Sequence, residues 1–289
     1  MAEIRDATWE DFDAVVDLLD RRSRAAFGAS DVQAAFIRQR WQLPGATLGW
    51  VATEGATLTG YASLDSTHEA TVAAAAAATG DALLATVEES ARARGYDHIA
   101  ITAVDSDRPL AELVRRRGLH LDREYVRMWR PLAGEAVAPS WPTGTTVRSY
   151  EQADGERVHA LLDEAYAGWE PDYVPRAHDE WVAFMTDHAE FDPELWFLVE
   201  RDAELVACAL HWRESEGRGW VKDIAVRESE RGRGLAKALL HHAFAVYKQR
   251  GVTEVGLKVD TSNPTGAPQL YDRVGFVTDQ RYGIWIRRL

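Results

Sequence analysis

The sequence predicts an α/β or α+β fold, in which helices pack on a β-sheet, present in two tandem copies. The chain has 289 residues, which suits two domains of about 150 residues each. Its two halves resemble each other, and each alternates apolar strand patterns with amphipathic helix patterns. The composition, 46% hydrophobic and 27% charged, excludes disordered, collagen-like and low-complexity proteins.

The similarity between the halves consists of matched residues at slowly increasing offsets. Ile4-Arg5 corresponds to Val147-Arg148 at an offset of 143, and Trp50-Val51 corresponds to Phe197-Leu198 at 147. Further along, the offset grows to 156 and then to 157. Self-similarity in a constant order marks a duplicated unit, so we expect one architecture in both halves.

The stretch between the copies shows neither a helical nor a strand period. It carries Pro139, Pro142 and Gly144, and each proline removes a backbone donor. We therefore place a linker at 133–143, between a first domain at 1–132 and a second at 144–289.

Each copy is expected to run strand, helix, second helix, two or three strands, helix, strand, helix, strand. In the second copy, β-branched and aromatic residues between turn signals predict strands over 195–200, 205–212, 220–226 and 254–259. Apolar residues recur every three to four positions from Leu235, and Gly251 follows a basic last turn, which predicts a helix between them.

The formal net charge of −13 argues against a nucleic-acid partner, because affinity for phosphates depends on Lys and Arg. Ten carboxylates against one arginine, Arg176, lie within 163–197. This segment would attract a cation or an amine, unless it is only a solvated helix surface.

No membrane span or signal peptide is apparent, so we expect a cytoplasmic protein. The single cysteine, Cys208, and the absence of zinc-site spacing predict neither a disulfide nor a metal site.

An anion-binding loop is the most informative motif. It runs from a predicted strand directly into a predicted helix and comprises Arg231, Gly232, Arg233, Gly234, Leu235 and Ala236. Its glycines let successive N–H groups turn toward one point, which the positive end of the helix also faces, and its arginines add charge. A pyrophosphate suits such a loop. A dinucleotide-binding loop would need a third glycine where Lys237 stands, and a Walker loop would need Gly-Lys followed by Ser or Thr.

The pattern Arg231-x-x-Gly234-x-Ala236 resembles the GNAT acetyltransferase superfamily. Val226 precedes it, and Asn263 and the segment Leu270-Tyr271-Asp272-Arg273-Val274-Gly275-Phe276 follow it. The resemblance covers the second copy nearly end to end, and the duplicated layout is similar to the tandem-domain branch that contains mycothiol synthase. It implies a GNAT fold in each copy, a mixed and mostly antiparallel twisted sheet flanked by helices. It also implies an acetyl-CoA-dependent N-acetyltransferase whose second domain is catalytic.

The resemblance implies specific roles toward acetyl-CoA. The backbone of the loop from Arg231 to Ala236 would hold the pyrophosphate. Ile224, Ala225 and Val226 would form a splayed strand along the pantetheine arm, with the Val226 amide polarising the thioester carbonyl. Asn263 would bond the pantetheine or nearby backbone, or serve only as a turn residue before Pro264. Arg273 would reach the 3′-phosphate.

Two residues are candidates for proton transfer. Tyr271 matches the family's general acid for the departing thiolate, and the alternative is a packed aromatic residue. Many family members place a Glu where this chain has Trp220 or Lys222. Asp223, which matches an acidic position in some small-amine acetyltransferases, is therefore our first candidate base. The alternative is a salt bridge at the sheet surface, with Lys222 on the opposite face by strand alternation.

The acceptor is expected to be a primary amine, including a cationic one, on a small or peptidic molecule. Trp169, Glu170 and Tyr173 lie in the region that forms the acceptor wall in this family, and aromatics mixed with carboxylates suit an organic cation. Acetylation of a cysteinyl amine, as in mycothiol synthase, is one alternative. A non-catalytic acyl-CoA-binding regulatory module is another.

The first copy is expected to be a degenerate domain that binds no CoA in this manner. At an offset of 156, the loop positions Arg231, Gly232 and Gly234 correspond to alanines within 75–78. A loop without glycine or arginine cannot form the same cluster of N–H groups.

Overall fold

The computed structural model describes residues 2–28, 30, 32, 34–42, 47–169, 173–187, 190–214 and 217–289. The first half contains β1 (Glu3–Asp6), η1 (Trp9–Asp11), α1 (Phe12–Phe27), α2 (Ala34–Gln42), β2 (Thr47–Glu54), β3 (Thr57–Asp65), β4 (Glu69–Ala74), α3 (Ala77–Ala93), β5 (His98–Val104), α4 (Arg108–Arg116) and β6 (His120–Pro131). The second half contains β7 (Thr145–Ser149), η2 (Gln152–Asp154), α5 (Gly155–Ala167), α6 (His178–Thr186), η3 (Pro193–Leu195), β8 (Phe197–Arg201), β9 (Glu204–Glu214), β10 (Arg218–Val226), η5 (Glu228–Glu230), α7 (Leu235–Gln249), β11 (Glu254–Asp260), α8 (Ala267–Arg273) and β12 (Val277–Arg288). The expected order of elements is thus present in both halves.

None of the described helices has the length and apolar character needed to cross a membrane.

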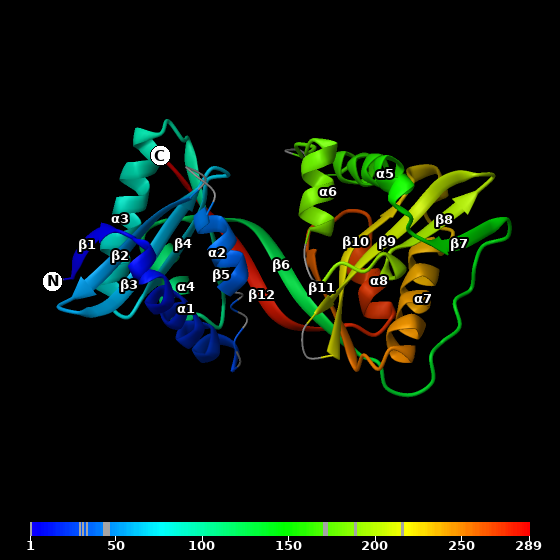
Figure 1. The fold of residues 1–289 in the computed structure, drawn as a ribbon, viewed down its shortest axis with the longest axis horizontal. Helices are drawn as coiled ribbons and strands as arrows, with labels where there is room; N and C mark the ends of the chain where they lie inside the picture. The colour runs from blue at the N-terminus through cyan, green and yellow to red at the C-terminus, as the bar shows by residue number, and fades with distance from the viewer. Residues whose placement is uncertain are drawn as a thin grey trace. The chain divides into compact units, whose positions relative to one another are not determined.

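The chain forms two compact units, and each unit contains a strand from the other half of the sequence (Figure 1). Unit 1 comprises Met1–Tyr125 and Gln280–Leu289, and unit 2 comprises Val126–Asp279. The strand order is β1-β2-β3-β4-β5-β12 in unit 1 and β6-β11-β10-β9-β8-β7 in unit 2. The division therefore differs from the expected boundaries of 1–132 and 144–289, because the last strand of each half joins the other unit.

Both exchanged strands are integral to the unit they join. β12 runs antiparallel to β5, from Tyr282 opposite Val104 to Arg288 opposite His98, and its Trp285 packs against the unit 1 core. β6 contributes buried residues, among them Met128, to the unit 2 core. Each unit thus depends on a segment that is remote in sequence.

The sheets are mixed and mostly antiparallel. In unit 1 the pairs β1–β2, β2–β3, β3–β4 and β5–β12 are antiparallel and β4–β5 is parallel. In unit 2 the pairs β7–β8, β8–β9 and β9–β10 are antiparallel and β10–β11 is parallel. The predicted fold class, two copies of a mixed sheet flanked by helices, is confirmed.

In unit 2 the strands bury alternate residues on the two faces of the sheet. Phe197 and Val199 of β8 belong to the core that includes α7, whereas Leu198 between them belongs to the core beneath α5 and α6. This alternation is the period of two that a strand covered on both faces requires. It holds β9 and β10 rigidly between two helical layers.

Gly256 of β11 shows why Trp220 has a packing role. A Cβ at Gly256 would lie 2.6 Å from the Trp129 ring and 2.7 Å from the Trp220 ring. The two rings meet edge to face with centroids 5.7 Å apart. Trp220 therefore packs β6 against β10 and β11.

Candidate active site

The loop between β10 and α7 has the backbone of an anion-binding turn. Gly232 and Gly234 have φ values of +76° and +86°, a region that is costly for residues with a Cβ. Gly234 is the N-cap of α7 and makes no side-chain cap bond. Among the described residues, no backbone hydrogen bond is donated by the N–H groups of residues 232–236. These groups, at the positive end of α7, are available to an anion.

The arginines of the loop differ in their contacts. Arg231 donates from Nε to the Val226 carbonyl at 3.2 Å, which ties the loop to the end of β10. Arg233 Nε lies 3.7 Å from a Glu230 carboxylate oxygen, and Arg201 lies 3.3 Å from the same oxygen. Glu230 thus offsets part of the positive charge beside the loop.

β10 separates from β11 just before the loop. Their described pairing runs only from Arg218 opposite Glu254 to Val221 opposite Leu257, whereas β10 continues beside β9 to Val226. The last residues of β10, including Ile224, Ala225 and Val226, therefore present an open edge toward β11 within the described structure.

The open edge carries the Val226 N–H. The next residue, Arg227, donates its N–H to the Val206 carbonyl of β9 at 2.9 Å. N–H directions alternate along a strand, so the Val226 N–H points away from β9, toward the open side. This is the direction that the predicted role of the Val226 amide requires. Ala225, by contrast, is buried opposite Cys208.

Asp223 lies at a β-bulge and is buried. The register of β10 against β9 shifts between Val221 and Asp223, and Asp223 is 7% exposed. Its carboxylate accepts hydrogen bonds from the Tyr166 hydroxyl and, at 3.3 Å, from Lys222 Nζ. The expectation that Lys222 occupies the opposite face is wrong, because a bulge interrupts strand alternation and lets the neighbouring side chains meet.

Tyr271 lies in α8 and is 9% exposed. Burial raises the pKa of its phenol far above the ordinary value, and the negative charge of Asp223 raises that pKa further. Its ring packs edge to face on Phe276 at 5.8 Å. The two predicted proton-transfer residues thus act on one another electrostatically, and the phenol is protonated at neutral pH.

Tyr166 is a site residue that the sequence analysis missed. It lies near the C-terminal end of α5, and its ring stacks on Tyr173 at 5.5 Å and approaches Trp169 at 6.2 Å. The predicted acceptor residues Trp169 and Tyr173 are thereby brought together around the partner of Asp223, whereas Glu170 lies outside the described residues. Helical spacing could have indicated that Tyr166 faces the sheet, because it lies four positions after the buried Leu162 and so shares its side of the helix.

Two weaker cofactor candidates lie apart from the loop. The Asn263 side-chain oxygen accepts from the Thr265 N–H at 2.9 Å and from its hydroxyl at 2.5 Å, which is the turn geometry weighed as the alternative. Arg273 is exposed at the end of α8. Their roles toward acetyl-CoA stay predictions.

Some carboxylates of the acidic segment 163–197 bind other side chains of the protein. Asp163 accepts a hydrogen bond from the Tyr173 hydroxyl at 2.5 Å. Asp192 and Glu194 form ion pairs with Arg250 at 2.5 and 2.6 Å. Some of its carboxylates are therefore structural.

Cys208 lies beneath the site but is not a reactive thiol. It is fully buried, and burial together with the Asp223 charge raises the pKa of the thiol to about 12. A nucleophilic cysteine needs a lowered pKa. Covalent transfer through Cys208 is therefore disfavoured.

In the described residues of unit 1, the connection from β4 to α3 has no equivalent of the loop. Only residues 75 and 76 connect β4 to α3, whereas residues 227–234 connect β10 to α7. The N-cap of α3, Ala76, is extended with φ −128°, and no positive-φ residue of the described chain lies in this connection. The backbone geometry that exposes successive N–H groups in unit 2 is thus missing from unit 1.

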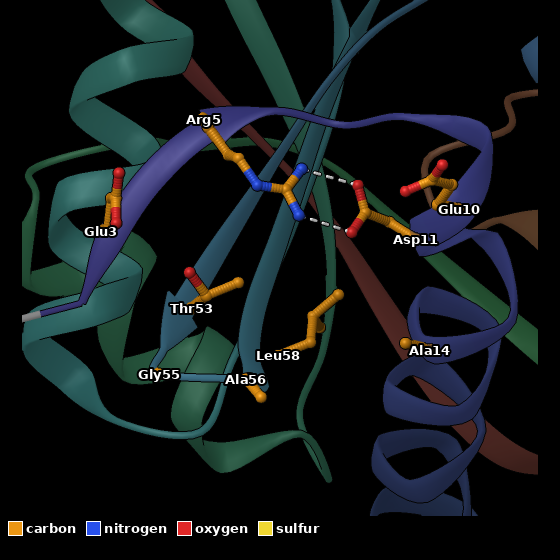
Figure 2. A pocket seen from close by; sticks show the side chains of 9 residues that line it. All are labelled: Glu3, Arg5, Glu10, Asp11, Ala14, Thr53, Gly55, Ala56 and Leu58. Carbon is orange, nitrogen blue, oxygen red and sulfur yellow. Dashed lines mark hydrogen bonds and ion pairs between the residues drawn. The ribbon is translucent and has the colours of Figure 1, made fainter.

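A pocket of about 440 Å³ in unit 1 surrounds a structural ion pair (Figure 2). Arg5 makes two hydrogen bonds of 2.7 Å to the Asp11 carboxylate, which also accepts from the Thr8 N–H at 2.8 Å. Arg148 and Asp154 repeat this pairing in unit 2 at 2.6 and 2.7 Å, at the offset of 143. Because it occurs in both units, we assign the pair to the fold and not to a ligand.

Comparisons with known proteins agree with this geometry. The family model described as acetyltransferase (GNAT) family matches residues 156–276. A protein named mycothiol acetyltransferase from Streptomyces avermitilis is 32% identical, and the alignment covers 93% of this chain and 89% of that protein. The crystal structure of a GCN5-related N-acetyltransferase from Sphaerobacter thermophilus is 26% identical with a TM-score of 0.79, covering 99% of this chain and 95% of that one. A tandem GNAT protein from the clavulanic acid biosynthesis pathway shares the fold, with a TM-score of 0.78 at 16% identity and coverage of 100% and 98%.

Proposed function

The chain belongs to the GNAT acetyltransferase family and is an N-acetyltransferase, and on this premise we propose that unit 2 binds acetyl-CoA and acetylates a primary amine of a small or peptidic acceptor. One observation carries the proposal. The N–H groups of residues 232–236, which donate no backbone hydrogen bond within the described structure, follow the open edge of β10 after five intervening residues, and the same strand carries the buried Asp223. A site for a pyrophosphate and a candidate base thus lie on one continuous segment.

The residues divide the binding of acetyl-CoA between them. The N–H groups of 232–236 and the charge of Arg231 would hold the pyrophosphate, as helix N-termini hold anions. The open edge from Ile224 to Val226 would bond the pantetheine arm as an added strand does. When bound, acetyl-CoA supplies the activated acyl group as a thioester.

The transfer is a direct attack in which three groups of the protein take part. The acceptor nitrogen forms a bond to the thioester carbonyl carbon, and the Val226 N–H stabilises the negative charge that develops on the carbonyl oxygen. Asp223, or a water that it orders, accepts the proton lost by the amine. The carbon–sulfur bond then breaks, and Tyr271 donates its phenolic proton to the departing thiolate.

The surroundings of Asp223 indicate the kind of acceptor. Tyr166, Trp169 and Tyr173 form an aromatic cluster beside the carboxylate. Aromatic faces and a buried carboxylate attract an amine that arrives as a cation. Asp223 would first orient that amine and then take its proton.

A second candidate, which the similarity to the Streptomyces avermitilis relative supports no better than the first, is acetylation of the cysteinyl amine of a thiol precursor. The same Asp223 and Tyr271 would serve. A cysteinyl amine and the matched alanyl amine, compared as acceptors, separate the two candidates. If kcat/KM for the cysteinyl amine exceeds that for the alanyl amine by more than about tenfold, the value of one well-made contact with the thiol, the second candidate is supported.

The cofactor site is tested by calorimetric titration with acetyl-CoA. The variant Arg231→Glu, Gly234→Glu places carboxylates where the pyrophosphate would bind. The matched control, Arg92→Glu, Gly134→Glu, changes an exposed arginine of α3 and another exposed glycine of positive φ. We expect one site per chain in the wild type and in the control, and none in the loop variant.

Each other result has a definite meaning. Two sites per chain would contradict the degenerate first copy. No binding by the folded wild type would contradict the acetyl-CoA proposal, and equal loss in both variants would assign the effect to charge or backbone strain in general.

A further inference from the structure

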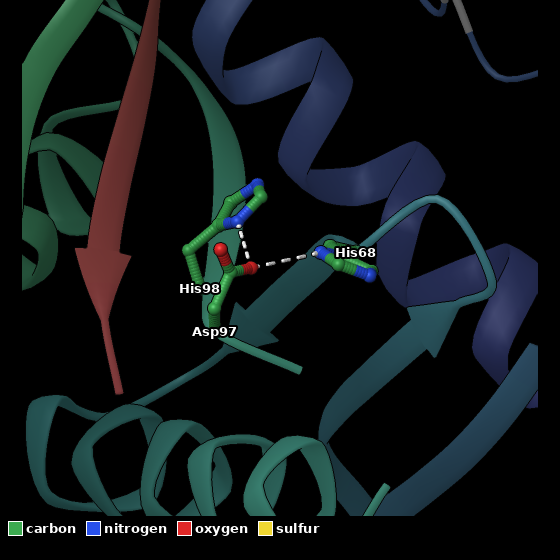
Figure 3. A group of neighbouring side chains, drawn as sticks. All are labelled: His68, Asp97 and His98. Atoms are coloured by element: carbon green, nitrogen blue, oxygen red, sulfur yellow. Dashed lines mark hydrogen bonds and ion pairs between the residues drawn. The ribbon is translucent and has the colours of Figure 1, made fainter. Parts of the chain in front are cut away.

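Unit 1 contains a cluster of side chains that acetyl transfer does not use, formed by His68, Asp97 and His98 (Figure 3). His68 lies in the turn between β3 and β4, His98 is the first residue of β5, and Asp97 immediately precedes it. One ligand atom from each residue lies within 4.8 Å of the others. In the part of the chain that the structure describes, no other group of His, Cys, Asp and Glu side chains meets this condition.

The distances in the cluster lie on either side of the spacing that metal ligands have. His98 Nδ1 lies 2.7 Å from Asp97 Oδ1, and His68 Nδ1 lies 3.8 Å from the same oxygen. A tetrahedral ion with bonds of about 2.0–2.1 Å holds its ligand atoms about 3.3–3.4 Å apart, between these two values. Both imidazoles already face the carboxylate (Figure 3). Small side-chain rotations would place the three atoms around one ion.

The backbone and an aromatic neighbour hold His68 in place. Its φ is +66°, a conformation that residues with a Cβ rarely adopt. Its carbonyl accepts from the Ala100 N–H at 2.9 Å, its N–H donates to the Asp65 carbonyl at 3.2 Å, and its ring stacks on Tyr96 at 4.0 Å. A ligand that is fixed before binding loses little conformational entropy when the ion arrives.

The cluster is also open, and in the described part of the chain no Lys or Arg is paired with Asp97. The described ion pairs of Asp97 are made with the two histidines only. The side chains of His68 and His98 are 27% and 33% exposed, and that of Asp97 is 76% exposed. An ion can therefore enter from solvent and retain a water molecule as a further ligand.

We propose that His68, Asp97 and His98 bind a divalent first-row transition-metal ion such as Zn²⁺. Two imidazoles and one carboxylate suit Zn²⁺, Co²⁺, Ni²⁺ or Cu²⁺, whereas Mg²⁺ and Ca²⁺ prefer oxygen ligands alone. Sequence spacing could not show the site, because His68 reaches the other two residues only through the pairing of β4 with β5. The proposal departs from the sequence-based expectation of no metal site, which rested on the spacing of Cys and His residues along the chain.

The bound ion would join the β3–β4 turn to the start of β5. The parallel pairing of β4 with β5 is short, with Glu69 opposite Ala100 and Ala70 opposite Ile101. An ion that binds the folded chain and not the unfolded chain stabilises the folded state by mass action. We therefore expect Zn²⁺ to raise the melting temperature of the protein.

The test is calorimetric titration of the full chain with zinc chloride, together with the visible absorption of the Co²⁺ form. His68→Asn keeps a residue that tolerates positive φ, and His98→Gln keeps a similar side-chain volume. His120→Ala, which removes an exposed histidine of β6, is the control. We expect one ion per chain in the wild type and the control, and affinity at least about 100-fold weaker in both ligand variants, since each loses one of three ligands.

The outcomes do not depend on acetyl transfer. Absence of Zn²⁺ binding to the folded wild type would overturn the proposal, as would undiminished binding in the two ligand variants. Loss of binding in His120→Ala would place the ion elsewhere. Circular dichroism of each variant distinguishes a lost ligand from a lost fold.

Discussion

At the scale of the residue, the hydroxyl of Tyr271 is the group whose removal separates chemistry from binding. Tyr271→Phe keeps the ring that packs on Phe276 and removes only the hydroxyl that we propose as the proton donor. We expect the turnover number to fall by roughly 10²–10⁴-fold, the usual contribution of a general acid. Affinity for acetyl-CoA should be unchanged. Steady-state rates with a primary amine, together with calorimetric affinity, measure the two quantities separately.

Tyr247→Phe is the matched control for this prediction. The Tyr247 hydroxyl is also buried in unit 2, but it donates to the Trp212 carbonyl at 2.8 Å and approaches the Trp220 carbonyl at 3.3 Å. Its loss should cost about 1 kcal/mol of stability, the value of a typical hydrogen bond, without a selective loss of turnover. Unchanged turnover in Tyr271→Phe would instead support a non-catalytic acyl-CoA-binding module.

At the scale of the element, the repeated Arg–Asp pair fixes the first strand of each unit to the short helix after it. Hydrogen bonds from Arg5 are the main reason that the pKa of Asp11 falls from 3.8 to about 2, against the opposing effect of burial. The unfolded chain binds the proton first as the pH falls. The pair therefore stabilises the fold fully above about pH 4, and this contribution is lost as the pH falls toward 2.

Asp11→Asn tests this pH dependence. We expect it to lower the free energy of unfolding by about 1 kcal/mol at pH 7, a value limited by solvent screening around the half-exposed Arg5. The difference from wild type should shrink at pH 2–3. Urea unfolding at both pH values measures it, with Asp13→Asn, an exposed site in α1, as the control. A difference that is the same at both pH values would mean that ionisation of Asp11 is not its source.

The sequence predicted the strands and helices of unit 2 because the spacing of apolar residues follows the face of each element that is buried. The strand expected over 220–226 is found at Arg218–Val226, and the helix expected from Leu235 begins there. The bulge beside Lys222 was not predictable, because a bulge depends on the register with the neighbouring strand and not on local composition. The contact between Lys222 and Asp223 was missed for the same reason. The approach of Tyr166 to that carboxylate was missed because it depends on how α5 packs against β10.

At the scale of the whole molecule, the repeat predicted the architecture of each copy but not the exchange of the last strands. β6 and β12 occupy equivalent places in the two halves, and a repeat alone does not specify which sheet edge each joins. Long-range contacts decide it: β12 pairs with β5 along its length, and Met128 of β6 lies in the unit 2 core. The compact units therefore divide the chain at other positions than the boundaries inferred from the linker.

Because β12 pairs with β5, we expect removal of the end of the chain to destabilise unit 1 and not unit 2. Truncation after Tyr282 removes the part of β12 that pairs with β5 from Ala103 to His98. It also removes Trp285 from the unit 1 core. An unpaired edge strand loses its ladder hydrogen bonds, so amide hydrogen exchange should accelerate in β5. In the same sample, β9 and α7 of unit 2 should retain their protection and serve as the internal control. Faster exchange in β9 or α7, with β5 unaffected, would mean that the last strand supports its own half of the sequence, as the linker-based boundaries would require.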